Sequence, residues 1–136
     1  MTLALIDARF EFNGVDLSDH VTSVTLPREI EALEDTAMGD TGRSRIGGLE
    51  DSTVQVNFNQ DFTAAAVDAT ISAALGTVVV IKVRPTSAAI GATNPEYVGS
   101  YLVSQYSPFG NGVGELATVN CSWPLSDPTG VARNVA

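Results

Sequence analysis

The sequence predicts a mainly β protein: a β-sandwich or barrel of six to seven antiparallel strands, with one short α-helix packed on it. Two observations lead to this fold class. Apolar and polar residues alternate through most of the chain, and only one segment changes to a helical period. Glycine, proline and asparagine cluster between the alternating segments, as turns require. With 136 residues, the chain has the length of one domain, so we expect a single domain over residues 1–136.

The first strands are predicted in the N-terminal quarter of the chain. Residues 4–12 alternate, with Phe10 and Phe12 on the apolar face, and Asn13-Gly14 is a strong turn signal after which residues 15–17 can pair back. Alternation resumes at Val21 and continues to Glu34. Pro27 interrupts this run, which indicates a bulge, a bend or an edge position.

Residues 35–50, DTAMGDTGRSRIGGLE, are predicted to form a long loop that leads to the next alternating strand. They include four glycines and few large apolar side chains. A hairpin normally needs a loop of about two to five residues, and structureless loops beyond roughly 12–15 residues are usually functional or disordered. We therefore expect this segment to bind something outside the subunit.

The second half of the chain continues the β pattern around one helix. Residues 51–60 alternate, with Val54, Val56 and Phe58 on one face. A short helix is predicted over 61–76, capped by an aspartate or threonine at its start and ended by a glycine. Three further strands are predicted before an irregular tail over 125–136; they cover 77–84, 96–106 and 116–123.

The charge of the chain argues against nucleic-acid binding. Sixteen acidic residues face seven basic ones, giving a formal net charge of −9, and Lys82 is the only lysine. Proteins that hold nucleic acid tightly cluster Lys and Arg, because neutralising phosphates supplies most of their affinity. We therefore expect this protein to repel DNA.

The residues that usually carry catalysis or bind metals are scarce. One histidine and one cysteine, Cys121, exclude the usual zinc sites, and no glycine-rich phosphate loop is present. A glycosidase-like pair of carboxylates stays open, because any two of the sixteen acids can meet in space. We expect no catalytic residue, no metal and no cofactor. We also expect no membrane insertion, because the longest aliphatic run, Val78–Ile81, is far below the roughly 20 residues of a membrane span.

Five segments follow one another in the order seen in a family of virion proteins. They are GVDLSDHVTSVTL at 14–26, GGLEDSTV at 47–54, LGTVVV at 75–80, NPEY at 94–97 and VGELATV at 113–119. Over nearly the whole chain, this pattern resembles the tail tube (major tail) protein of a long, flexible-tailed bacteriophage. Such proteins are similar in fold to the tube subunit of type VI secretion systems.

The resemblance implies a structural protein of the virion that is assembled in the cytoplasm of the host bacterium. Six subunits would form a ring, the rings would stack, and DNA would pass through the channel without specific binding. Further partners would be the tail-tip or baseplate, tape-measure and tail-terminator proteins. The loop would bind a neighbouring subunit through Met38, Arg43, Arg45 and Ile46. Four strands of each subunit would line the channel, and the predicted lining residues come from three of them: Glu29, Glu31, Gln55, Asn57, Asn59, Thr118, Asn120 and Ser122.

Two other functions remain open. One is a different structural protein of a virion, at the tail end or decorating the capsid. The other is a carbohydrate-binding module that stacks sugars on aromatic rings, for which the candidates are Tyr97, Tyr101, Tyr106 and Trp123. The period-2 placement of these aromatics favours a core position instead.

Overall fold

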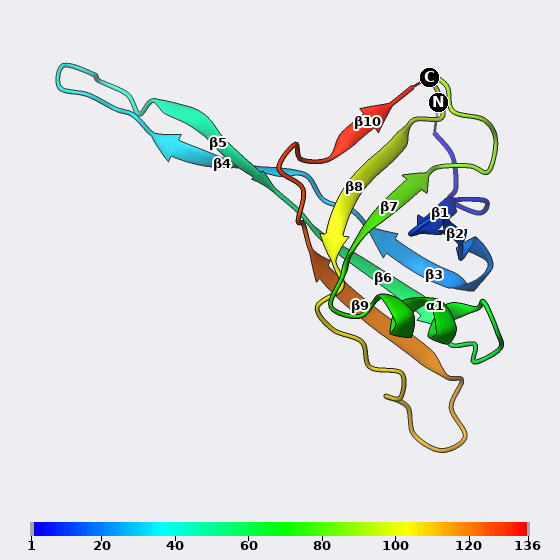
Figure 1. The fold of residues 1–136 in the computed structure, drawn as a ribbon. Coiled ribbons are helices and arrows are strands. Elements are labelled where there is room, and N and C mark those ends of the chain that lie inside the picture. Colours follow the sequence, from blue (N-terminus) through cyan, green and yellow to red (C-terminus); the bar gives the residue numbers. More distant parts are fainter. Residues whose placement is uncertain (1, 136) are drawn as a thin grey trace.

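The computed structural model describes residues 2–135 and shows two sheets that face each other, with a long hairpin projecting from one of them (Figure 1). All strand pairs in this part of the chain are antiparallel. The mainly β fold class with one α-helix is therefore confirmed.

Five strands form the larger sheet, in the order β10-β8-β7-β1-β2. Their bounds are Arg9–Phe12 for β1, Val15–Asp16 for β2, Val78–Arg84 for β7, Glu96–Leu102 for β8 and Ala132–Asn134 for β10. A 3-10 turn, η1, covers Ser18–His20.

Three strands form the second sheet, in the order β3-β6-β9, with bounds Val21–Thr25, Thr53–Asn59 and Thr118–Pro124. The hairpin consists of β4, Glu29–Glu34, and β5, Arg45–Asp51. It continues the ribbon made by β3 and β6, because β4 follows β3 and β5 precedes β6 (Figure 1).

The core lies between the two larger sheets and is closed at one end by α1, Val67–Ala74. Val54, Val56 and Phe58 are fully buried, as their alternation predicted. Aromatic rings join the sheets: Phe10 meets Phe58 edge to face at 5.7 Å, and Phe12 lies 5.3 Å from Trp123. Tyr101 and Trp123 are also fully buried, so they offer no surface on which a sugar can stack.

Replacing Trp123 by alanine should cost about 3–5 kcal/mol of the free energy of unfolding, because it removes a large buried ring. It also removes the hydrogen bond of 2.9 Å that the indole N–H of Trp123 donates to the carbonyl of Gln105. Urea unfolding measures the loss. Val78→Ala is the control, since Val78 is half exposed and should change stability by less than about 1 kcal/mol. Equal losses in the two variants would contradict this account of the core.

The helix is shorter than predicted, since α1 covers Val67–Ala74 rather than 61–76. Asp61 closes a local turn instead, by accepting hydrogen bonds from the backbone N–H and the hydroxyl of Thr63. Ala65 has a positive φ of 61°, which a helix does not allow. The glycine signal at the other end is confirmed, because Gly76 has a φ of +82° directly after the helix.

Two segments predicted as irregular contain strands. The loop predicted over 35–50 is too long. Strand β5 begins at Arg45, so only residues 35–44 connect the two strands of the hairpin. The tail over 125–136 contains β10, which pairs with β8 through Ala132 and Val98. The described residues form ten strands rather than six or seven, since Pro27 also divides the predicted strand 21–34 into β3 and β4.

Candidate assembly surface

Six of the predicted channel residues lie together on the outer side of the three-stranded sheet. They form three cross-strand pairs between β6 and β9: Gln55 with Ser122, Asn57 with Asn120, and Asn59 with Thr118. Successive side chains of a strand point to opposite faces, so these six share the face opposite the core. We call them the polar face. All six side chains are uncharged.

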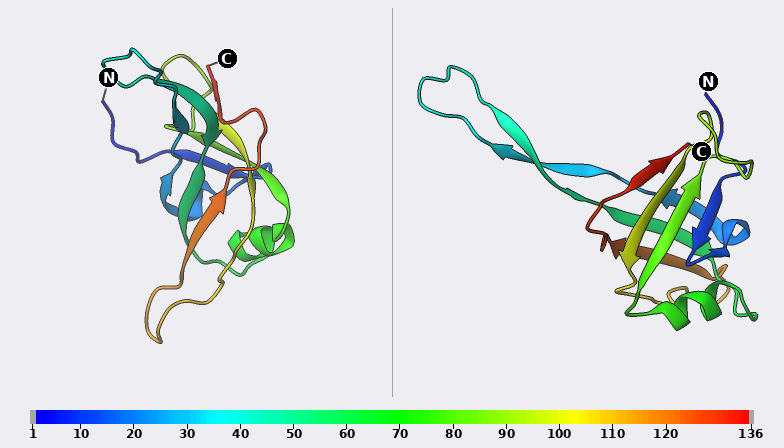
Figure 2. Two further views of the ribbon diagram at one scale, coloured as in Figure 1. Left: turned by 90° about the vertical axis from the view of Figure 1, so that its left-hand side faces the viewer. Right: turned by 45° about the horizontal axis from the view of Figure 1, so that its top comes forward.

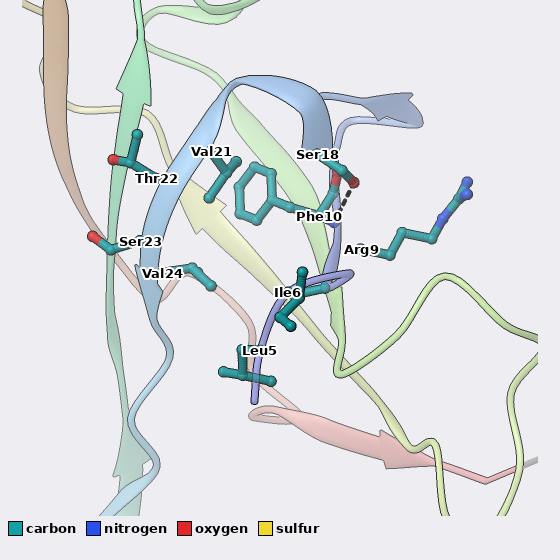
Figure 3. Close-up of a pocket in the computed structure, with 10 residues that line it drawn as sticks. Leu5, Ile6, Arg9, Phe10, Ser18, Val21, Thr22, Ser23 and Val24 are labelled. Atoms are coloured by element: carbon teal, nitrogen blue, oxygen red, sulfur yellow. Dashed lines mark hydrogen bonds between the residues drawn. The ribbon is translucent and has the colours of Figure 1, made fainter. Parts of the chain in front are cut away.

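Both edges of this sheet lack a strand partner within residues 2–135, since β3 and β9 are its outer strands. An open edge presents unpaired N–H and C=O groups, and another chain can pair with them. A groove of about 280 Å³ lies along the free side of β3. Leu5 and Ile6 of the N-terminal segment face Val21 and Val24 across it (Figure 3).

Glu29 and Glu31, the other two predicted channel residues, lie apart from the polar face. They belong to β4, beyond the break at Pro27, and both are exposed. Glu29 is the cross-strand partner of Asp51, and together with Leu49 these acids line a shallow hollow in the hairpin. The structure therefore places a neutral polar face on the body and an acidic surface at the base of the hairpin.

Most residues of the hairpin are exposed. Every residue of β4 is exposed, and Ile30, Ile46 and Leu49 have 62%, 54% and 82% of their surface exposed. Leu33 and Ile46 are cross-strand partners and thus project from one face. A two-stranded hairpin is marginally stable at best when nothing covers it. This hairpin therefore exposes apolar side chains that a single copy of the chain leaves uncovered.

The tip of the hairpin, residues 35–44, is closed by its own hydrogen bonds. Asp35 N–H donates to the carbonyl of Ser44 at 3.0 Å, and Asp40 accepts from the N–H of Ala37 at 2.8 Å. Met38 is fully exposed here. Of the two predicted interface arginines, Arg43 lies 3.5 Å from Glu34 of its own chain, and Arg45 is the cross-strand partner of Glu34.

Ser52 joins the base of the hairpin to the sheets that enclose the core. Its buried hydroxyl donates to the carbonyl of Pro27 at 2.6 Å and shares a hydrogen bond of 2.9 Å with the hydroxyl of Tyr101 on β8. Its own carbonyl accepts from the N–H of Leu125 at 2.8 Å. Ser52, which lies between β5 and β6, thus connects the link between β3 and β4, strand β8 and the C-terminal segment. The alternation pattern gave no signal for this role, because it depends on contacts between distant segments.

Glu50 makes a second set of hydrogen bonds at the base of the hairpin, to Arg28 and Val131, which we call the Glu50 tie. Its carboxylate accepts hydrogen bonds at 3.2 Å from the guanidinium of Arg28 and from the backbone N–H of Val131. These bonds to Arg28 and Val131 hold the pKa of Glu50 below its ordinary value. The C-terminal segment, which the sequence analysis treated as an irregular tail, is therefore part of the support of the hairpin.

Gly130→Ala should loosen this tie. Gly130 has a φ of +77°, and a Cβ there would lie 2.6 Å from a carboxylate oxygen of Glu50. The left-handed backbone alone costs about 1–2 kcal/mol for a residue with a side chain. Urea unfolding should show at least this loss. Gly110→Ala is the matched control, because its Cβ meets open space and its φ is not positive; a loss as large there would contradict the argument.

Acidification should weaken the Glu50 tie as well. A carboxylate whose pKa is lower in the folded state adds stability above its unfolded pKa, and this stability is lost as the pH falls through the folded pKa. Asp16, Asp61 and Asp127 also have lowered pKa values, so Glu50 supplies only a share. Glu50→Gln should therefore lose less stability than the wild type between pH 6 and pH 3, measured by urea unfolding. Parallel curves for the two proteins would contradict this role of Glu50.

Two kinds of reactive group can be assessed within residues 2–135, namely metal ligands and the thiol of Cys121. No group of three or more His, Cys, Asp or Glu side chains in that range is placed to hold a metal ion. Burial raises the pKa of Cys121 to about 12, so its thiol is not a ready nucleophile. No helix in the described part of the chain is long and apolar enough to cross a membrane.

Two solved structures contain chains with a similar fold. No protein-family model matches the chain, and neither does any curated protein. Among solved structures, a chain in the virion of a native gene transfer agent particle is similar, with a TM-score of 0.76 and 8% identity, over 98% of this chain and 99% of that one. A chain in the tail of an empty gene transfer agent particle, determined with helical refinement and C6 symmetry, gives a TM-score of 0.63.

The chain is similar in fold to a chain of that tail. The second match has 9% identity and covers 86% of this chain and 82% of the other. At such identities the likeness concerns the fold, and at that level it confirms the resemblance to phage tail proteins seen in the sequence. Within residues 2–135, this fold leaves the projecting hairpin exposed and the edges of the three-stranded sheet unpaired.

Proposed function

We propose that this chain is the repeating subunit of a tail tube, in which rings of six copies stack and conduct DNA. The observation that carries the proposal is the hairpin, whose apolar side chains no part of the described chain covers. Exposed apolar surface on a specific projecting element marks a protein-binding site. The tail-protein fold, found in a structure with C6 symmetry, supports six as the number of copies.

The open edges of the three-stranded sheet support ring closure. In this proposal, β9 of one copy meets β3 of the next, so that the sheets join around the channel. Closing a ring of sheets removes every open edge, which is otherwise a site of aggregation. The groove beside β3 would accommodate side chains of the neighbouring β9.

The polar face would then line the channel, together with Glu29 and Glu31 at the base of the hairpin. This lining lacks the Lys and Arg side chains that bind phosphates, so DNA would pass without being held. Met38, Arg43, Arg45 and Ile46 of the hairpin would contact a neighbouring subunit. Tape-measure, tail-tip or baseplate and tail-terminator proteins would be the other partners, in a virion assembled in the bacterial cytoplasm.

Light scattering of the purified protein over a hundredfold range of concentration tests the proposal. We expect the mass to rise from one copy to large assemblies as concentration increases. Moderate salt should not prevent this, because apolar contacts dominate the hairpin. A protein that remained a monomer at every concentration and salt would overturn the proposal.

A further inference from the structure

Two stacked phenylalanine rings lie exposed at the end of the molecule opposite the hairpin. Phe62 and Phe109 have ring centroids 5.4 Å apart at an angle of 23°, and 52% and 78% of their surfaces are exposed. Val113 and Leu116, on the same loop as Phe109, are also largely exposed. The proposed polar channel and its sheet edges do not explain these side chains.

Side-chain hydrogen bonds hold the segment that carries Phe109 in place. Gln60 donates from its side-chain amide to the hydroxyl of Tyr106 at 3.0 Å and to the carbonyl of Pro108 at 3.2 Å. Tyr106 in turn donates to the carboxylate of Asp68 on α1 at 2.6 Å. The segment that carries Phe109 is therefore tied to the helix and to the end of β6.

The register of β6 and β9 shows that the pair and the hairpin are at opposite ends. The hairpin enters β6 at Thr53, whose partner is Pro124, whereas Phe62 follows the other end, where Asn59 pairs with Thr118. Seven residues of β6 separate the ends by about 20 Å, at about 3.3 Å per residue. The left view of Figure 2 shows the hairpin at the top of the molecule and the β8–β9 loop at the bottom.

Both ends of the molecule carry acids, so apolar contact rather than charge would join them. No Lys or Arg occurs in 46–81 or in 85–132, so the aromatic end has carboxylates, such as Asp61 and Glu115, without a nearby basic residue in sequence. The hairpin carries Arg43, whose side chain is 70% exposed, and Arg45. Glu34, Asp35 and Asp40 lie in the same part of the hairpin, and Arg43 is 3.5 Å from Glu34.

We propose that the hairpin of one copy docks on the Phe62–Phe109 pair of the next copy along the stack. The apolar pair Leu33–Ile46 would contact the phenylalanine rings. Two different surfaces of one chain then meet head to tail, which yields an open, repeating assembly rather than a closed dimer. This inference rests on the proposed function and names the surface that receives the hairpin.

The double variant Phe62→Ser with Phe109→Ser tests the docking surface. Because both rings are exposed, the variant should unfold at nearly the wild-type urea concentration. Electron microscopy should show at least a tenfold loss of tube length, down to rings or short stacks. Val78→Ser is the matched control, since Val78 is as exposed as Phe62 but lies on β7, and it should form tubes of normal length. Normal tubes from the double variant would overturn the inference.

Cross-linking provides a second readout that does not depend on tube length. In a Cys121→Ser background, subunits with Ile46→Cys are mixed with subunits with Phe109→Cys and treated with a short bis-maleimide. We expect a cross-linked dimer from this mixture, and at least tenfold less when Val78→Cys replaces Phe109→Cys. Equal yields in both mixtures would overturn the inference while leaving tube formation intact. A wild-type chain that forms no assemblies would overturn the proposed function, and this inference with it.

Discussion

Replacing residues 33–46 by the two-residue turn Asn-Gly should produce a folded subunit that no longer forms tubes. Ala32 and Gly47 are cross-strand partners, so a two-residue turn can join them without changing the register of the remaining hairpin. The replacement removes Leu33, Met38 and Ile46, together with both hairpin arginines. The core contains none of the deleted residues, so urea unfolding should stay close to that of the wild type.

Electron microscopy and light scattering measure the loss of assembly, which we expect to exceed tenfold in the mass of sedimentable protein. The control is Asp40→Asn, which alters the tip but leaves every apolar side chain of the hairpin in place. Tubes of normal length from the shortened chain would show that the hairpin does not hold the assembly together.

Changing Glu29 and Glu31 to lysine should strongly slow the ejection of DNA from assembled tails. Both residues are exposed, so the subunit should still fold. Ring symmetry would repeat each change around the channel, so every subunit would lose two acids and gain two bases there. DNA carries one negative charge per about 1.7 Å of its axis, and a basic lining would hold it through release of counterions. Screening limits this effect to about 8–10 Å in physiological salt.

Ejection of labelled DNA from variant particles, triggered in solution, measures the rate. Raising the salt concentration should restore part of the rate, because the added attraction is electrostatic. Glu29→Gln with Glu31→Gln is the control that removes the acids without adding bases, and it should eject DNA at close to the normal rate. Normal ejection by the lysine variant, at low salt as well, would show that these two residues do not face the passage.

The sequence was sufficient for the parts of the fold that depend on alternation. Val54, Val56 and Phe58 point into the core because a half-buried strand places every second side chain there. The same alternation predicted the polar face, whose six residues the structure brings together in three cross-strand pairs. Gly76 marked the end of the helix, because only a residue without a side chain adopts its backbone conformation easily.

The length of β5 was underestimated, because two glycines that were assigned to the loop lie in this strand. Gly47 and Gly48 lie within β5, where an added Cβ would come within 3.3 Å of Ile30 and 3.2 Å of Leu33. They make room for large side chains of the facing strand. A glycine-rich run in a strand is therefore easily mistaken for a loop.

Contacts between distant segments explain the remaining differences. The buried hydroxyl of Ser52 binds Pro27 and Tyr101, and the three-residue strand β10 forms because β8 offers it an edge. Neither has a periodic pattern in its own sequence. Glu29 and Glu31 share the polar pattern of the six residues of the polar face, but the strand break at Pro27 places them in the separate two-stranded sheet of the hairpin.

Electron microscopy of the purified wild-type protein at high concentration tests the central claim most directly. The account predicts hollow tubes whose averaged end views show six copies, with the polar face toward the channel and the hairpin reaching into the next ring. Isolated monomers, or closed assemblies that never stack, would contradict it.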